Sequence, residues 1–299
     1  MKKILITVDI EAQPVRASGN HIERLCYGRF GDGQEFGIGK MFDIAEQTNT
    51  RLTCFLDYAE AYLYGDEFLN VGRYIKSRGH DLQLHLHPEF LTNTAFVGTG
   101  VTREDNMFLV NRSQAEFLIE FCVDTHEKLT GESPIAFRGG GYRYNGEILN
   151  ALAKRGIRFN SSYNPARSNQ PFNIGPTKQF DYTCGITELP ISCVANYMNS
   201  KRLYEYNFNS DILKKGSTID CIHSHEQYLN EYFLQYGDEA IAILVMHCWS
   251  FLNFNYATGT YDSADYEAAD KFVKLLEMLN KKYTLVTASD LSSIPAIHI

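Results

Sequence analysis

Hydrophobic positions along the chain form two kinds of pattern, short continuous apolar runs and longer stretches with helical spacing. Continuous apolar runs suit strands that are buried on both faces of a parallel sheet. They lie at residues 3–9, 51–57, 81–87, 134–138, 157–161, 186–191, 240–248 and 283–288. Helical spacing occurs between several of them, at residues 41–48, 61–78, 113–129, 146–154 and 263–280. The chain is therefore expected to alternate strands with helices.

Repeated strand–helix units predict a parallel sheet with helices outside it. About eight strands within 299 residues favour closure of the sheet. The sequence thus predicts an α/β fold, an irregular (β/α) barrel of seven or eight parallel strands, with an open doubly wound sheet as the alternative. We expect one domain over residues 1–299, because no repeat or linker interrupts it. An irregular insertion, rich in Asn, Tyr, Ser and Pro, is expected at about 164–235.

Charge and apolar content exclude several classes of partner. The formal net charge is -8 and no basic block exists to neutralise phosphates, so a nucleic-acid partner is not expected. No apolar stretch approaches the roughly 20 residues needed for a membrane span. The first apolar run is too short for a signal peptide, which predicts a cytoplasmic protein. The seven cysteines include no CxxC pair, as expected for buried free thiols in a reducing compartment.

Titratable side chains gather where the predicted strands end. Asp9 and Glu11 follow the first strand, His85 and His87 end the third, and His247 ends the strand at 240–248. In β/α barrels the active site lies at the carboxyl ends of the strands. These residues are therefore expected at one end of the barrel, although each pair taken alone is equally compatible with an ordinary strand end or with structural histidines.

The spacing of the two pairs suggests a metal site. Residues separated by one position on an extended chain point to the same side, so Asp9 lies with Glu11 and His85 with His87. Two carboxylates in one pocket repel each other unless a cation joins them or one has a raised pKa. Neutral imidazoles beside carboxylates suit zinc or a similar divalent ion.

Two further strand ends carry residues suited to a sugar pocket. Arg138 precedes three glycines and Tyr142, and glycines such as Gly140 allow close approach of the backbone to a ligand. An arginine beside carboxylates can also orient one of them through paired hydrogen bonds. His247 lies two residues before Trp249, the only tryptophan. The alternatives are a surface arginine before a flexible loop and a core histidine.

Two segments outside this pattern allow weaker predictions. His223, His225 and Glu226 are interpreted as the start of a helix with exposed histidines, and the alternative is a second metal site. Residues 196–210 are polar and aromatic, and long irregular segments of compact domains are often binding loops. We expect this segment, with Tyr204 and Tyr206, to lie beside the strand ends and to influence substrate choice.

These segments together resemble the polysaccharide deacetylase (NodB-homology) superfamily, which has the fold of carbohydrate esterase family 4. The resemblance runs in order over most of the chain. The segments that carry it are LITVDIE, RLTCFL, GHDLQLHLHPEF, FRGGGYRYN, GIRFNSSY, TELPIS, LVMHCWSF and KKYTLVTASDL. The LHLHPE variant is similar to a branch found in O-antigen gene clusters, of the WbmS-like kind.

The resemblance implies a role for each matching residue. Asp9 matches the general base, Arg138 the arginine that orients the base, and His247 the general acid. Glu11 stands where a carboxylate ligand, usually Asp, is found, and His85 matches the first ligand histidine. The second ligand histidine usually comes four residues later, where this chain has Glu89. The expected metal ligands are therefore Glu11, His85 and His87, with Glu89 as the substitute for His87.

The function implied by the resemblance is hydrolysis of the N-acetyl group of an amino sugar by a metal-dependent deacetylase. The metal is expected to be zinc, and the partner is a carbohydrate substrate, in a surface polysaccharide or its precursor. Gly140, Tyr142 and Trp249 are the expected substrate contacts. The alternatives are a carbohydrate-binding barrel that has lost turnover and a related metal-dependent amidase or esterase.

Overall fold

The computed structural model describes residues 2–31, 33–172, 174–195, 197 and 202–291. The chain divides into two compact units, the first made of residues 1–53 and 206–287 and the second of residues 54–205 and 288–299. No helix among the described residues is long and apolar enough to cross a bilayer.

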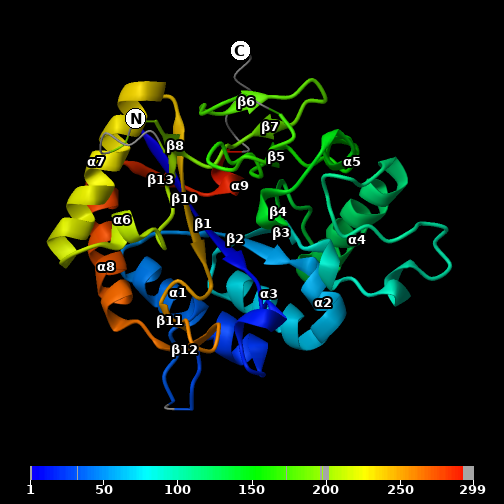
Figure 1. The fold of residues 1–299 in the computed structure, drawn as a ribbon, viewed down its shortest axis with the longest axis horizontal. Coiled ribbons are helices and arrows are strands. Elements are labelled where there is room, and N and C mark those ends of the chain that lie inside the picture. Colours follow the sequence, from blue (N-terminus) through cyan, green and yellow to red (C-terminus); the bar gives the residue numbers. More distant parts are fainter. Residues whose placement is uncertain (1, 32, 173, 196, 198–201, 292–299) are drawn as a thin grey trace. The chain divides into compact units, whose positions relative to one another are not determined.

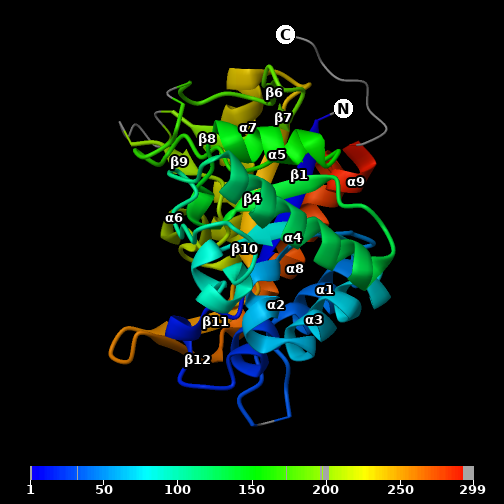
Figure 2. The same ribbon diagram turned by 90° about the vertical axis from the view of Figure 1, so that its right-hand side faces the viewer.

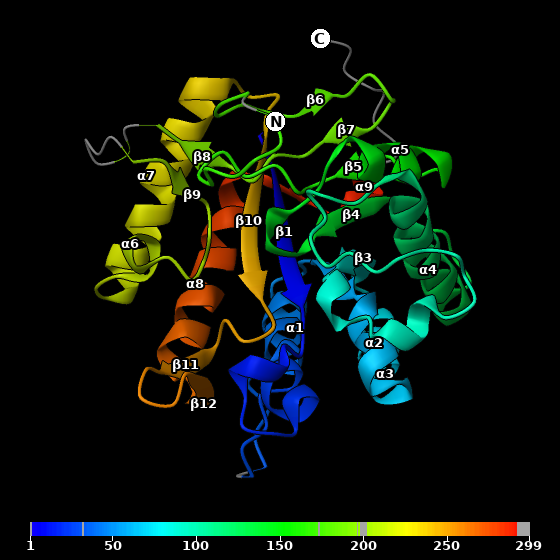
Figure 3. The ribbon, with the colours of Figure 1, turned by 45° about the vertical axis from the view of Figure 1, so that its right-hand side comes forward.

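The sheet of the first unit is built around its first strand. β1 (Lys3–Ile10) pairs in parallel with β10 (Ile241–His247) and with β13 (Thr284–Val286). Figures 1 and 3 show the arrows of β1 and β10 side by side and pointing the same way. Seven of the eight residues of β1 are buried, which explains why its sequence is continuously apolar instead of alternating.

The first unit also contains helical segments and a hairpin that follows β10. The helical segments are η1 (Pro14–Arg16), η2 (Ile22–Cys26), α1 (Ile38–Gln47), α6 (Asp211–Lys214), α7 (Thr218–Tyr236) and α8 (Tyr266–Lys282). The hairpin consists of β11 (Leu252–Asn255) and β12 (Thr260–Ala264), paired antiparallel. Side chains cap the two long helices, Ser217 at α7 and Asp265 at α8, which satisfies backbone N–H groups that would otherwise lack partners.

The strands of the second unit follow one another in the order β2-β3-β4-β5-β7-β6. Its strands are β2 (Thr53–Asp57), β3 (Asp81–Leu86), β4 (Ala136–Gly139), β5 (Phe159–Asn160), β6 (Phe180–Asp181) and β7 (Thr187–Glu188). The pairs β3–β4, β4–β5 and β5–β7 are parallel, and β6 is antiparallel to β7. A separate antiparallel pair is formed by β8 (Cys193–Val194) and β9 (Tyr204–Glu205).

Helices connect the parallel strands of the second unit. They are α2 (Tyr58–Tyr64), α3 (Asp66–Ser77), α4 (Arg112–Thr130) and α5 (Gly146–Lys154), with the short turns η3 (Pro88–Phe90), η4 (Asn93–Phe96) and η5 (Gly140–Tyr142). The last helix, α9 (Ala288–Leu291), follows β13 and connects no strands. The single helix predicted at 61–78 is two helices, α2 and α3. Gly65 separates them with a φ of 62°, a conformation that only glycine adopts readily.

A buried polar network joins β5 to β7 in the second unit. The fully buried Glu188 carboxylate accepts hydrogen bonds from Asn160 Nδ2 (2.5 Å), the backbone N–H of Tyr163 (2.9 Å) and the hydroxyl of Tyr182 (3.0 Å). The Tyr182 hydroxyl also lies 2.7 Å from that of Tyr144. Burial raises the pKa of Glu188 to about 8, although each of these hydrogen bonds lowers it.

Most predicted strands and helices are confirmed, among them the helix expected to start near His223, which is α7. This helix lies within the stretch expected to be an irregular insertion, and several of its buried positions carry residues that are not clearly apolar, including Cys221, Ser224 and His225. The β11–β12 hairpin was not predicted, nor were the short elements β6, β8, β9 and α6. The cysteines are free, as expected, and all except Cys184 are buried.

Candidate active site

Three titratable side chains of the first unit meet at the carboxyl ends of β1 and β10. Asp9 and His247 are direct partners in the β1–β10 register, and Glu11 follows β1 by one residue. Their carboxylate oxygens and imidazole nitrogens lie within 4.8 Å of one another. Asp9 is 3% exposed and Glu11 2%. We call Asp9, Glu11 and His247 the carboxylate–imidazole cluster.

The backbone around this cluster is held by several hydrogen bonds. The backbone N–H of Cys248 donates to the carbonyl of Asp9 (3.0 Å), and the thiols of Cys26 and Cys248 donate to the carbonyl of Glu11 (3.7 and 3.1 Å). The backbone N–H of His247 donates to Ser250 Oγ (2.9 Å). These contacts fix the direction in which the chain leaves each strand, and so the placement of the three side chains.

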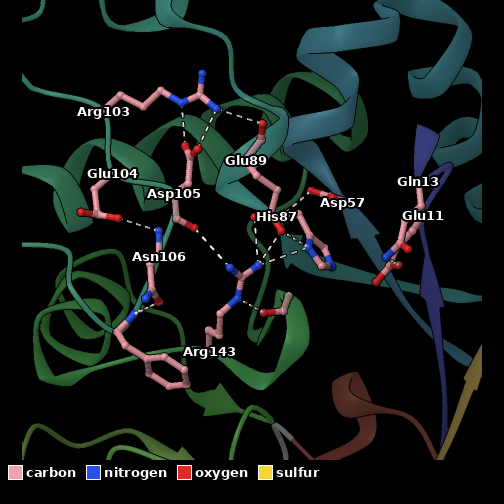
Figure 4. A network of polar contacts seen from close by, with 12 residues as sticks. Glu11, Gln13, Asp57, His87, Glu89, Arg103, Glu104, Asp105, Asn106 and Arg143 are labelled. Carbon is pink, nitrogen blue, oxygen red and sulfur yellow. Dashed lines mark hydrogen bonds and ion pairs between the residues drawn. The ribbon is translucent and has the colours of Figure 1, made fainter. Parts of the chain in front are cut away.

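Glu11 is also held through its side chain. Gln13 Nε2 donates to Glu11 Oε2, as Figure 4 shows, and Arg16 Nε donates to Gln13 Oε1. Gln13 has a φ of 22°, which is unfavourable for a residue with a Cβ. Strained backbone of this kind is often found at functional sites, where the surrounding contacts maintain it.

The His247 ring is stacked on the ring of Trp249, with centroids 4.8 Å apart and planes at 21°. The Arg16 guanidinium lies 5.2 Å from the centre of the Trp249 ring. Trp249 is only 3% exposed, and it contacts Tyr261 as well as the histidine and the arginine. Its role as a substrate contact stays a prediction.

The carboxylate–imidazole cluster fits a divalent metal. Two buried carboxylates at this separation repel each other strongly unless a cation compensates them. Oxygen and imidazole nitrogen ligands suit zinc and similar ions. The residues present are therefore chemically able to hold the cofactor that the sequence predicted.

The second unit places the two predicted histidines together. His85 on β3 and His87 just after it have ring centroids 5.1 Å apart, and both are buried. The backbone N–H of His87 donates to Asp57 Oδ1 (3.1 Å), which also accepts from the backbone N–H of Ala59 at the start of α2. Asp57 therefore fixes the chain at the carboxyl ends of both β2 and β3.

Glu89, the proposed substitute ligand, is bound to an arginine. Arg143 Nη2 donates to both oxygens of Glu89 (2.6 and 2.9 Å), and His87 Nδ1 lies 3.0 Å from Glu89 Oε1 (Figure 4). Burial alone would raise the pKa of Glu89. His87 and Arg143 outweigh burial and hold the pKa at about 2. Glu89 is thus an ionised partner of Arg143, a residue that sequence reasoning did not single out.

The three glycines after Arg138 allow close packing. A Cβ on Gly140 would lie 2.5 Å from the His87 ring, and one on Gly139 would lie 2.0 Å from the carbonyl oxygen of Arg143. Gly141 and Tyr142 have φ angles of 60°, which is unfavourable for a tyrosine. The contacts of Gly140 and Tyr142 with substrate remain predictions. The close approach of the His87 ring already explains why residue 140 is a glycine.

Arg138 is completely buried. Its guanidinium lies 4.4 Å from the centre of the Phe55 ring, and it donates to the carbonyl and the hydroxyl of Ser161 (3.1 and 3.0 Å). The surface arginine considered as an alternative is therefore wrong. The part assigned to Arg138 in orienting Asp9 stays a prediction.

In the two other predicted segments His225 and Tyr206 lie in the core, and the expected influence of residues 196–210 on substrate choice stays a prediction. His225 is buried beside Tyr206, its Nδ1 3.1 Å from the tyrosine hydroxyl, and burial lowers its pKa to about 3. The expectation of exposed histidines was correct for His223 and wrong for His225. Of residues 196–210, positions 196 and 198–201 lie outside the described residues. Tyr206 is fully buried and stacks on Tyr228, so it belongs to the core.

Comparison with known proteins gives structural matches only. No protein-family model and no curated protein sequence matches the chain. A protein from Mycobacterium smegmatis, described as a polysaccharide deacetylase, matches with a TM-score of 0.61 and 13% identity. The match covers 97% of this chain and 88% of that protein. The chain has the polysaccharide deacetylase fold. The predicted irregular (β/α) barrel is thereby confirmed over the open sheet.

Two further structures show that proteins with this fold differ in activity. One is a variant, with restored enzymatic activity, of a CE4 family pseudoenzyme from Bacillus anthracis (TM-score 0.50, 11% identity, 97% of this chain and 67% of that one). The other is the 4-α-glucanotransferase from Thermococcus litoralis (TM-score 0.53, 12% identity, 100% of this chain and 39% of that one). One fold supports different chemistry, so function must be argued from the site.

Proposed function

We propose that this protein is a metal-dependent deacetylase that hydrolyses the N-acetyl group of an amino sugar, in a surface polysaccharide or its precursor. The observation that carries the proposal is the carboxylate–imidazole cluster, with both carboxylates buried, placed at the carboxyl ends of two parallel strands. All three of its residues lie in segments that resemble the deacetylase motifs. The deacetylase fold supports the same assignment.

We propose Glu11, His85 and His87 as the metal ligands, as the resemblance implies. Glu89 is less suited to replace His87, because both of its oxygens already accept hydrogen bonds from Arg143. A bound zinc ion would polarise the acetamide carbonyl and lower the pKa of a water molecule. His247 is the alternative third ligand, since its imidazole lies close to both carboxylates.

The chain's own groups would then move the protons. Asp9 accepts a proton from the attacking water as the new C–O bond forms, and His247 donates a proton to the sugar nitrogen as the C–N bond breaks. Acetate and a free amino sugar result. Trp249 restricts the rotation of the His247 ring by stacking on it. Backbone N–H groups at residues 139–142 would stabilise the negative oxygen of the intermediate, and Arg138 would orient Asp9.

A second candidate is a carbohydrate-binding barrel that has lost turnover. The specific observation in its favour is the Glu89–Arg143 pair, which stands where the family usually has its second ligand histidine. A protein described as a pseudoenzyme shares the fold. A binding protein needs neither a base nor an acid, however, and this chain has both Asp9 and His247 in one cluster.

One experiment separates the two candidates. Purified protein is analysed for bound metal and assayed for acetate release from a panel of N-acetylated amino sugars, with Asp9→Asn as the matched control. The proposal expects about one divalent ion per chain and acetate release by the wild type only. Metal-replete protein that binds a sugar of the panel and releases no acetate would favour the binding barrel.

A further inference from the structure

A continuous row of aromatic rings leads away from the carboxylate–imidazole cluster. It begins with the His247–Trp249 stack. Trp249 contacts Tyr261 on β12 (5.7 Å between centroids), Tyr261 contacts Phe254 on β11 (5.1 Å), and Phe254 contacts Tyr256 (5.1 Å). All of these residues belong to the first unit. Figure 2 shows the loop that joins β11 and β12 extending away from the strands of this unit.

Exposure rises along this row. Trp249 is buried, Tyr261 and Phe254 are partly exposed, and Tyr256 is 90% exposed. Single exposed aromatic residues are common on protein surfaces, but adjoining ones form the kind of patch that marks a binding site. We call Phe254, Tyr256 and Tyr261 the hairpin aromatic patch.

Within the hairpin the side chains beside the patch are polar and almost uncharged, and from outside it Arg16 hydrogen-bonds to Tyr261. Residues 252–264 include no lysine or arginine and one acidic residue, Asp262, while Asn253, Asn255, Thr258, Thr260 and Ser263 supply amides and hydroxyls. An anionic membrane surface or a nucleic acid would need a cluster of basic residues here, which the single Arg16 does not provide. Aromatic faces flanked by amides and hydroxyls suit sugar rings, whose C–H faces are apolar and whose edges carry hydroxyl groups.

We infer that the hairpin aromatic patch binds the sugars of a glycan chain that lie next to the reacting one. The inference rests on the proposed function, because the row of rings starts at the proposed general acid. If the patch binds neighbouring sugars, the substrate is an oligosaccharide or polysaccharide and not a single activated sugar. Tyr256 and Phe254 are then specificity-determining residues that do not touch the reacting bond.

The test compares glycan binding in matched variants of the full, metal-replete protein. N-acetylglucosamine and chitohexaose are titrated by calorimetry into the Asp9→Asn protein, in which the probes are not consumed. The same titrations are made with Phe254→Ala and Tyr256→Ala added together. Leu234→Ala, which removes an 82% exposed side chain from α7, is the control. Circular dichroism establishes that each variant is folded.

We expect chitohexaose to bind at least about 10-fold more tightly than the monosaccharide, and the double hairpin variant to lose that advantage while monosaccharide binding is unchanged. Equal affinity for the two probes, or undiminished chitohexaose binding by the double variant, would overturn the inference. A wild-type dimer that the double variant abolishes, with chitohexaose binding retained, would instead identify an interface between copies. The titrations measure binding and do not depend on turnover. An absence of deacetylation by the wild type would therefore overturn the proposed function and leave the inference about the patch standing.

Discussion

Asp9 and His247 are direct register partners on the adjacent parallel strands β1 and β10. The two residues are far apart in sequence, and the pairing of the strands brings the proposed base and the proposed acid to the same level of the sheet. Because β1 and β10 are buried along nearly their whole length, this placement is supported by the core. A base and an acid held so close together can act on the same substrate carbonyl and nitrogen.

Replacing Asp9 by Asn should lower acetate release by about 10²- to 10⁴-fold, because the amide cannot accept a proton from water. The bound metal should stay near the wild-type level if Glu11, His85 and His87 are the ligands. Steady-state kinetics with elemental analysis of the same sample measures both quantities. Loss of metal together with activity would show that Asp9 is itself a ligand.

Replacing His247 by Ala should lower turnover of an N-acetyl sugar by about 10²- to 10⁴-fold. Turnover of an activated acetate ester should fall much less, because its leaving group departs without a proton. The ratio of the two rates is the informative quantity. Equal losses on both substrates would refute the acid role, and a fall in metal content would make His247 a ligand in place of one of the predicted three.

Replacing Gln13 by Ala should weaken metal binding by about 10- to 100-fold, because Gln13 holds one oxygen of Glu11 in place. The effect is expected in metal affinity, measured by competition with a chromogenic chelator. At saturating metal, kcat and KM should return to within about threefold of wild type. Unchanged metal affinity would mean that Gln13 supports only the local fold.

Glu188 should make stability depend on pH. Burial raises its pKa to about 8 in the folded protein, whereas in the unfolded chain it is expected near 4.3. The folded state therefore binds the proton more tightly. The stabilising contribution is complete below about pH 4.3 and is lost as pH rises toward about 8. In this window the free energy of unfolding should fall by up to about 1.4 kcal/mol per pH unit because of this group.

Glu188→Gln removes this titration and leaves an acceptor for the Tyr163 N–H, while the Tyr182 hydroxyl can rotate to accept from the new amide. The Asn160 amide loses its acceptor, so the variant should be less stable than the wild type at low pH. Urea unfolding at pH 6 and pH 8 should show a smaller loss of stability in the variant than in the wild type. The same loss in both proteins would show that Glu188 does not titrate in this range.

The sequence predicted the strands that place the site, because a strand buried on both faces has a distinctive apolar run. The segments that became β1, β3 and β10 were predicted nearly to the residue, and with them the positions of Asp9, His85 and His247. The parallel register that pairs Asp9 with His247 depends on contacts between distant segments, and no local pattern shows it.

The contacts that hold these side chains were not predictable in the same way. The bond from Gln13 to Glu11 needs a strained turn, and the bond from Arg143 to Glu89 needs the close packing that Gly140 allows. No spacing of residues along the sequence predicts either hydrogen bond. The aromatic hairpin was missed because its alternation is irregular, with a shift in register between Asn253 and Phe254.

The most direct test of the proposed chemistry is acetate release by the purified protein from an N-acetylated amino-sugar oligosaccharide, measured before chelation, after it, and after zinc is restored. We predict release by the metal-replete protein, loss of at least about 100-fold on chelation, recovery with zinc, and no recovery in Asp9→Asn. Undiminished release after complete removal of metal, or no release by a metal-replete protein that binds the oligosaccharide, would contradict a metal-dependent deacetylase.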